Sequence, residues 1–157
     1  MTDAPQTADT RPVVVVGMDG SPAGRKAGRW AIRYAEKMGA RLKFVAAWQS
    51  LSRYGAFGYL PDSDSEIAER TRSSLLEEVA ELLGEALPED CEVTASCGNP
   101  AQVLIKHSVG AHCLVVGSRG HAGLAGVVLG SVSAECAAHA KCPVVVVHGG
   151  DQIDLAA

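Results

Sequence analysis

The sequence predicts an α/β fold, in which a parallel sheet of five strands carries helices on both faces. Three short apolar runs, at residues 13–16, 113–116 and 143–147, consist mostly of valine and are typical of strands buried on both faces. Longer segments with apolar residues at helical spacing alternate with these runs. Because the alternation begins and ends on a strand, right-handed crossovers would join the strands into one parallel sheet.

The first part of the chain gives clear signals for a strand, a helix and a second strand. After residues 13–16 a short turn leads to Ser21, which can cap a helix, and to Pro22, which suits the first helical position. This helix is expected to end near Met38, because Gly39 can adopt the left-handed conformation of a helix stop. Its apolar stripe contains Trp30, Ala31, Tyr34, Ala35 and Met38. Residues 41–48 form the second strand.

A long loop is expected after the second strand. It spans residues 49–64 and holds the aromatic residues Tyr54, Phe57 and Tyr59. Loops of this length are uncommon inside a compact domain and often cover a site, but a disordered excursion would give the same pattern. Both interpretations stay open.

The rest of the chain repeats the alternation of helices and strands. The expected elements are a helix at 65–87, a strand at 91–96, a helix at 101–109, a strand at 113–116, a helix at 134–140 and a strand at 143–147. Pro88 and Gly110 follow the first two of these helices and suit their ends. A single domain over 13–148 results, with a flexible N-terminal tail at 1–12 and a C-terminal tail at 149–157.

Composition narrows the class of function. The 157 residues include 14 basic and 18 acidic side chains, a net charge of −4, with no dense basic run. Nucleic acid and anionic membrane surfaces are therefore not expected partners. No apolar run is long enough to span a bilayer, and the first twelve residues lack the apolar centre of a signal peptide, so a cytoplasmic location is expected. The five cysteines form no C-x-x-C pair and are expected to be reduced.

A glycine-rich stretch follows the fourth strand, over residues 117–133. Glycines let backbone N–H groups approach an anion without interference from a Cβ atom, and a helix start supplies further free donors. Arg119 adds a cation, and Ser131 and Ser133 place hydroxyls where the next helix should begin. The stretch favours phosphate binding, although a flexible surface loop with ordinary caps would have a similar composition.

A second glycine-bearing turn, residues 17–21, follows the first strand. In parallel sheets ligands bind beyond the carboxyl ends of the strands, where the strand order reverses. If the first and fourth strands are neighbours, both turns line one crevice, which strengthens the prediction of a ligand site there.

Three motifs, in matching order and spacing, resemble the universal stress protein family over about 13–148. Gly117, Gly120, Gly130 and Ser131 match the pattern of its ATP-binding branch: glycine, two residues, glycine, nine residues, then glycine and serine or threonine. Residues 16–22, Val-Gly-Met-Asp-Gly-Ser-Pro, resemble the family's first strand and turn, and residues 142–146, Cys-Pro-Val-Val-Val, resemble its last strand. The resemblance implies a Rossmann-like open five-stranded parallel sheet in the order 3-2-1-4-5.

The same resemblance implies an adenine-nucleotide site. Its residues would be Gly17, Met18, Asp19, Ala46, Gly117, Arg119, Gly120, Gly130, Ser131, Val132 and Ser133. Asp19 would lie at the adenine and ribose end, and the backbone near Ala46 would contact adenine. Gly117, Arg119 and Gly120 would run under the ribose and phosphates, and residues 130–133 would bind phosphate oxygens through backbone N–H and hydroxyl groups. A homodimer through the last strand, Val144–Val147, is also implied; that edge would otherwise invite uncontrolled pairing.

Other chemistry has weaker support. Cys136, His139 and Cys142 have metal-like spacing, but the first two fall on a predicted helix and the third belongs to the entry of the last strand, so no metal site is expected. The sequence shows no motif that pairs a nucleophile with a general base, and no lysine follows the glycines as in a Walker A loop. No catalytic residue is therefore assigned.

The expected function is therefore an ATP-binding regulatory or signalling module of the stress response, with at most slow ATP hydrolysis. Mg²⁺ held by the phosphates is compatible with this role, and AMP or a cyclic nucleotide would satisfy the same features. The alternatives are a nucleotide-free protein-interaction module of the same fold, or an ATP-cleaving or adenylyl-transferring enzyme. The sequence names neither the stress nor the protein partner.

Overall fold

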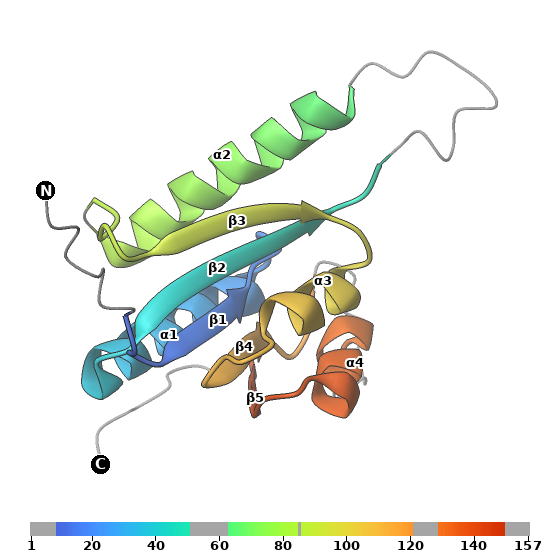
Figure 1. Cartoon of the computed structure of the whole chain (residues 1–157). Helices are drawn as coiled ribbons and strands as arrows, with labels where there is room; N and C mark the ends of the chain where they lie inside the picture. The colour runs from blue at the N-terminus through green and yellow to red at the C-terminus, as the bar shows by residue number, and fades with distance from the viewer. Residues whose placement is uncertain (1–8, 51–62, 85, 121–128, 150–157) are drawn as a thin grey trace, which may run out of the picture.

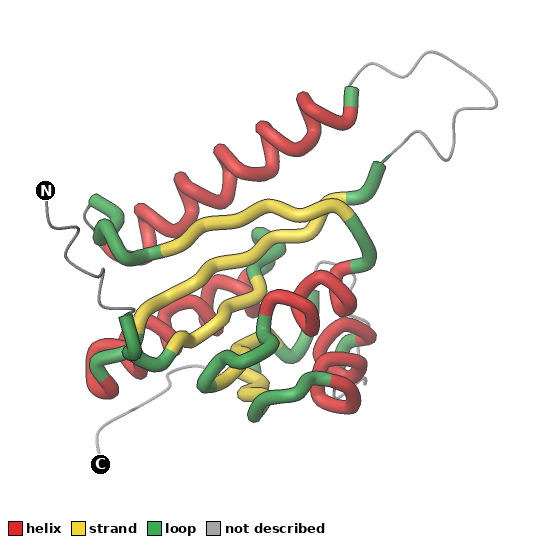
Figure 2. Tube along the Cα trace, viewed as in Figure 1, coloured by secondary structure: helices red, strands yellow, loops and turns green. Residues whose placement is uncertain are grey.

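Five parallel strands and four helices form an open α/β fold in the computed structural model, which describes residues 9–50, 63–84, 86–120 and 129–149 (Figures 1 and 2). The strands are β1 (Val13–Gly17), β2 (Arg41–Trp48), β3 (Glu92–Cys97), β4 (Cys113–Gly117) and β5 (Val144–Val147). The helices are α1 (Pro22–Met38), α2 (Asp64–Leu83), α3 (Pro100–His107) and α4 (Ser131–His139). The sheet order is β3-β2-β1-β4-β5, which confirms the predicted fold class and strand order.

Strand β1 lies at the centre and sets the position of the site. Val14 is in register with Leu42 of β2 on one side and with Cys113 of β4 on the other. The strand order therefore reverses between β1 and β4, and a crevice is expected beyond their carboxyl ends.

The valines of β1 alternate between two cores, one on each face of the sheet. Val14 and Val16 pack with Phe44 in the core under α1 and α2, whereas Val15 packs with Val45 and others in the core under α3 and α4. Three of the four valines of β1, Val14, Val15 and Val16, are 0% exposed, as expected for a strand covered on both faces. Helix α1 contacts β1, β4 and β5, and α2 contacts β2 and β3, so these two helices divide one face between them.

Helix ends differ from the predictions by a few residues. Helix α4 begins at Ser131, where residue 134 was predicted, with Gly130 as its N-cap. Helix α2 ends at Leu83, where residue 87 was predicted, because Gly84 adopts φ +71° and its N–H bonds to the Ala80 carbonyl. Helix α3 begins at Pro100 and ends at His107, where 101–109 was predicted. The predicted stop at Gly39 is confirmed by its φ of +62°.

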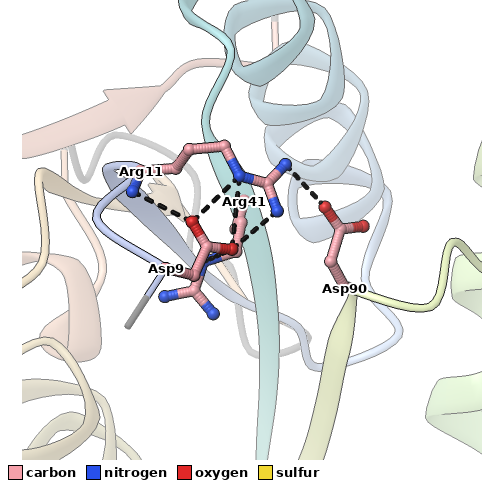
Figure 3. Close-up of polar contacts among 4 residues, drawn as sticks. All are labelled: Asp9, Arg11, Arg41 and Asp90. Carbon is pink, nitrogen blue, oxygen red and sulfur yellow. Dashed lines mark hydrogen bonds and ion pairs between the residues drawn. The ribbon is translucent and has the colours of Figure 1, made fainter. Parts of the chain in front are cut away.

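The segment before β1 is tied to the amino edge of the sheet (Figure 3). Arg11 pairs with Asp9 at 2.6 Å and with Asp90, just before β3, at 2.8 Å. Arg41, the first residue of β2, pairs with Asp9 at 3.2 Å. The Arg11 guanidinium holds the pKa of Asp9 at about 2. Four residues thus join the chain entry to β2 and β3, at the edge opposite the predicted site.

Three expectations lie partly or wholly outside the described residues. Residues 51–62 contain the three loop aromatics, residues 121–128 form the middle of the predicted glycine-rich stretch, and residues 1–8 and 150–157 make up most of the two predicted tails. Within the described part of the chain, no helix is long and apolar enough to cross a membrane.

Candidate functional site

A cavity of 580 Å³ lies at the carboxyl edge of the sheet, at the reversal of strand order. All of the predicted site residues line it except Ala46: Gly17, Met18, Asp19, Gly117, Arg119, Gly120, Gly130, Ser131, Val132 and Ser133. The turn after β1 and the described ends of the glycine-rich stretch therefore meet in one crevice. Its volume lies within the range of about 300–1,000 Å³ that is typical of sites for small molecules.

Strand β2 contributes to this cavity through the neighbours of Ala46. Val45 and Ala47 line it, whereas Ala46 is 7% exposed and packs in the core under α1 and α2. Successive side chains of a strand point to opposite faces of the sheet, which explains why Val45 and Ala47 face the cavity and Ala46 does not. The predicted contact of Ala46 with adenine is through its backbone. The packing of its side chain does not test this contact, which stays a prediction.

The turn after β1 is organised by a buried serine. Ser21, 1% exposed, accepts a hydrogen bond from the Gly24 N–H at 3.1 Å and so caps α1. The hydroxyl and the backbone N–H of Ser21 both donate to Asp19 Oδ1, at 2.5 and 3.0 Å. These bonds fix the direction of the Asp19 carboxylate.

Asp19 also brings the first turn against the glycine-rich stretch. A Cβ atom on Gly120 would lie 2.7 Å from Asp19 Oδ2, so the Asp19 carboxylate would have to move to make room for it. The carboxylate can take this place because residue 120 has no side chain. One acidic side chain thus lies between the two turns that form the crevice.

Gly117 allows a second close approach, at the end of β4. A Cβ atom on this residue would lie 2.7 Å from the carbonyl carbon of Ala23 and 2.9 Å from the Ala23 Cβ. The first turn of α1 therefore packs directly on the last residue of β4. Through this contact the floor of the cavity depends on the position of α1.

The start of α4 supplies donors for an anion. The first N–H groups of any helix have no partner inside the helix, and here they belong to residues 131–133, which line the cavity. The partial positive charge of the helix start adds to them, and the exposed Arg119 lines the same cavity. This end of the cavity suits a phosphate or another compact anion.

The hydroxyl of Ser133, one of the groups predicted to bind phosphate, makes hydrogen bonds within the protein. It donates to the carbonyls of Ser118, at 3.1 Å, and Gly130, at 3.0 Å. Ser131, by contrast, is exposed at the cavity, and no side-chain cap bond closes the helix start.

An apolar wall was missing from the sequence interpretation. Pro100 and Leu104 of α3 line the cavity together with Val116 and Leu129. Helix α3 directly follows β3, so its first turn lies at the carboxyl edge of the sheet. This order of elements in the sequence could have predicted that α3 borders the cavity. A cavity with one apolar wall and one end rich in N–H donors can hold a ligand that has a flat apolar part and an anionic part.

The five cysteines differ in exposure: Cys113 and Cys136 are buried, Cys91 and Cys142 are partly buried, and Cys97 is exposed. Burial raises the pKa of the Cys113 and Cys136 thiols to about 11. Among the described residues, no group of three or more histidine, cysteine, aspartate or glutamate side chains could hold a metal ion.

The family model described as "Universal stress protein family" matches residues 11–148 of the chain. Universal stress protein Rv2005c of Mycobacterium tuberculosis (strain ATCC 25618 / H37Rv) is 34% identical over 134 residues, which cover 85% of this chain and 44% of that protein. The chain thus spans less than half the length of this relative.

Solved structures of similar fold include complexes with nucleotides. A universal stress protein in complex with cAMP has a TM-score of 0.67 and 27% sequence identity, covering 88% of this chain and 98% of that chain. The universal stress protein from Archaeoglobus fulgidus in complex with dAMP has a TM-score of 0.53 and 19% identity, covering 87% and 97%. The second likeness shows the fold alone.

Proposed function

The chain belongs to the universal stress protein family, and we propose that it binds an adenine nucleotide in the cavity between the ends of β1 and β4. One observation carries the proposal: the cavity joins an apolar wall to a helix start with free N–H donors and an arginine. The similar protein that was solved with cAMP supports an adenine nucleotide as the ligand class. ATP is the nucleotide we favour, because the chain carries the glycine and serine pattern of the ATP-binding branch.

The two ends of the cavity suggest how the nucleotide lies. The phosphates would accept hydrogen bonds from the N–H groups of residues 131–133 and pair with Arg119. The base would lie toward Val45 and Ala47, and Asp19 would accept from the ribose. A Cβ atom on Gly130 would already lie 3.3 Å from the Ser118 carbonyl oxygen, so any larger side chain there would crowd the phosphate end.

Binding, rather than turnover, would be the main activity. Asp19 is the one carboxylate that lines the cavity among the described residues, so a Mg²⁺ ion would be held mainly by the phosphates. No histidine or lysine of the described chain lines the cavity to act as a general base, which favours hydrolysis that is slow at most. The protein would act as a cytoplasmic regulatory module of the stress response, whose bound state a protein partner reads.

A homodimer through β5 is part of the same proposal. Strand β5 is an edge of the sheet, and an edge strand presents unpaired N–H and C=O groups. Pairing of two such edges would cover Val144–Val147 in both copies. Sedimentation equilibrium tests this: a monomer at micromolar concentration would contradict the proposal.

Calorimetric titration of nucleotide-free protein tests the site. ATP, AMP and cAMP should each be titrated into the native chain and into Gly130→Val. The matched control is Gly149→Val, because, among the described residues other than its chain neighbours, none has a heavy atom within 4 Å of the ideal Cβ position of Gly149. Binding by the native chain and by Gly149→Val, but not by Gly130→Val, is expected. If the native chain binds none of the three nucleotides at millimolar concentration, the proposal fails and a nucleotide-free interaction module becomes the better reading.

A further inference from the structure

One backbone carbonyl, that of Ser118, joins the end of β4 to the start of α4. It accepts a hydrogen bond from the Gly130 N–H at 2.6 Å and another from the Ser133 hydroxyl at 3.1 Å. The Ser133 hydroxyl also lies 3.0 Å from the Gly130 carbonyl. Ser118 and Ser133 are 3% and 2% exposed, so this hydrogen-bonded group is shielded from water.

The chemistry of a hydroxyl limits what Ser133 can do for a phosphate. A hydroxyl has a single proton to donate, and here that proton is directed at two carbonyl oxygens. The oxygens of an ionised phosphate are acceptors only. The Ser133 side chain therefore cannot donate to a phosphate while it keeps its bonds to Ser118 and Gly130.

We propose that Ser133 is a positioning residue, whose hydroxyl holds the Ser118–Gly130 junction in the geometry that phosphate binding needs. The inference rests on the proposed function, because it concerns the same cavity. Gly130 packs closely on the other side of the junction, where its ideal Cβ position lies 3.5 Å from Arg119 Cα. The bonds of Ser133 thus fix the distance between Arg119 and the first N–H groups of α4, the two sources of positive charge at this end.

Ser108 provides a matched control for the loss of a buried serine hydroxyl. It is 0% exposed, and its hydroxyl donates at 2.9 Å to the carbonyl of Ile105, three residues earlier. Ser133 makes the same local bond to Gly130, also three residues earlier, and differs by its second bond to Ser118. Ser108 caps the far end of α3 and does not line the cavity, so its loss should not change nucleotide binding.

Three variants and two ligands test the inference by calorimetry. Ser133→Ala should bind ATP at least about tenfold more weakly than the native chain, which corresponds to about 1.4 kcal/mol. Its affinity for adenosine, which has no phosphate, should stay near the native value. Ser133→Thr, which keeps the hydroxyl, should bind ATP nearly as well as the native chain, and Ser108→Ala should bind both ligands like the native chain. Circular dichroism should confirm that each variant is folded.

The outcomes separate the inference from the proposed function. If the native chain binds no ATP, the proposed function fails. If it binds ATP but Ser133→Ala binds equally well, or loses ATP and adenosine to the same extent, the positioning role is wrong. Amide hydrogen exchange of the ligand-free protein gives an independent arm: the Gly130 N–H should exchange faster in Ser133→Ala than in Ser108→Ala. Equal exchange rates in the two variants would also overturn the role.

Discussion

Substitution of Gly117 by alanine should destabilise the protein through one steric contact. The new Cβ atom would lie 2.7 Å from the Ala23 carbonyl carbon and 2.9 Å from the Ala23 carbonyl oxygen. Favourable contacts between carbon atoms lie at about 3.5–4.0 Å, so the first turn of α1 and the end of β4 would have to move apart by nearly an ångström. Overpacking of this kind costs about 1–3 kcal/mol. We expect the upper half of that range, because backbone atoms cannot rotate out of the way.

Urea and thermal denaturation would measure this loss. A destabilisation of about 2–3 kcal/mol should lower the Tm by about 4–12 °C in a domain of this size. Gly149→Ala is the control, since no described residue other than its chain neighbours comes within 4 Å of its Cβ position. Surface changes of that kind stay within about 0.5 kcal/mol. If Gly117→Ala is as stable as Gly149→Ala, then α1 does not approach β4 as described, and the cavity built on that approach is wrong.

Three further predictions address other parts of the chain. Ser21→Ala should lower the free energy of unfolding by about 1–2 kcal/mol in urea titrations, because α1 loses its N-cap; an unchanged midpoint would contradict the described cap. Burial and the charge of Lys43 lower the pKa of His107 in the folded protein. As the pH falls, the imidazole of the unfolded chain therefore binds a proton before that of the folded chain, and the stability should decrease below about pH 6.5. His107→Gln should weaken this pH dependence of stability between pH 7.5 and 5. At pH 8 the exposed Cys97 should react with a thiol reagent well before the buried Cys136, whose pKa is about 11. Mass spectrometry of the labelled protein would measure the order of reaction, and labelling of Cys136 first would contradict the prediction.

The strands were predictable because their signal is local. Four consecutive valines are typical of a strand buried on both faces, and in the structure three of them are buried in the two cores while Val13 is partly buried. The start of α4 was not predictable in the same way. Ser131 and Ser133 suggest a capped helix start, but the structure uses Gly130 as the N-cap without a side-chain bond. The hydroxyl of Ser133 finds a partner fifteen residues earlier in the chain, at Ser118, which no local pattern specifies.

The site was predictable where glycines and the acidic residue mark it, and less so where packing builds it. Asp19 and the described ends of the glycine-rich stretch line one cavity, as their places after β1 and β4 implied. The wall formed by Pro100 and Leu104 depends on how α3 crosses the sheet. The choice between Ala46 and its neighbours depends on which face of β2 turns toward the cavity. Strand alternation alone leaves that choice open, because both faces of this sheet are apolar.

The glycines of the site have a cause that lies within the protein itself. None of Gly17, Gly117, Gly120 and Gly130 has a positive φ, so backbone conformation does not require glycine at these positions. Instead, a Cβ atom on each would press on a different part of the fold, within 2.7 Å at the first three and 3.3 Å at the last. The contacts at Gly17 and Gly120 are with side-chain ends, those of Leu104 and Asp19, which can move aside. The contacts at Gly117 and Gly130 are with backbone atoms, so packing by itself favours glycine at these two positions. It follows that glycine at positions 117 and 130 does not by itself separate a nucleotide binder from an interaction module. The separation rests on the cavity and on the free donors at the start of α4, which packing does not require.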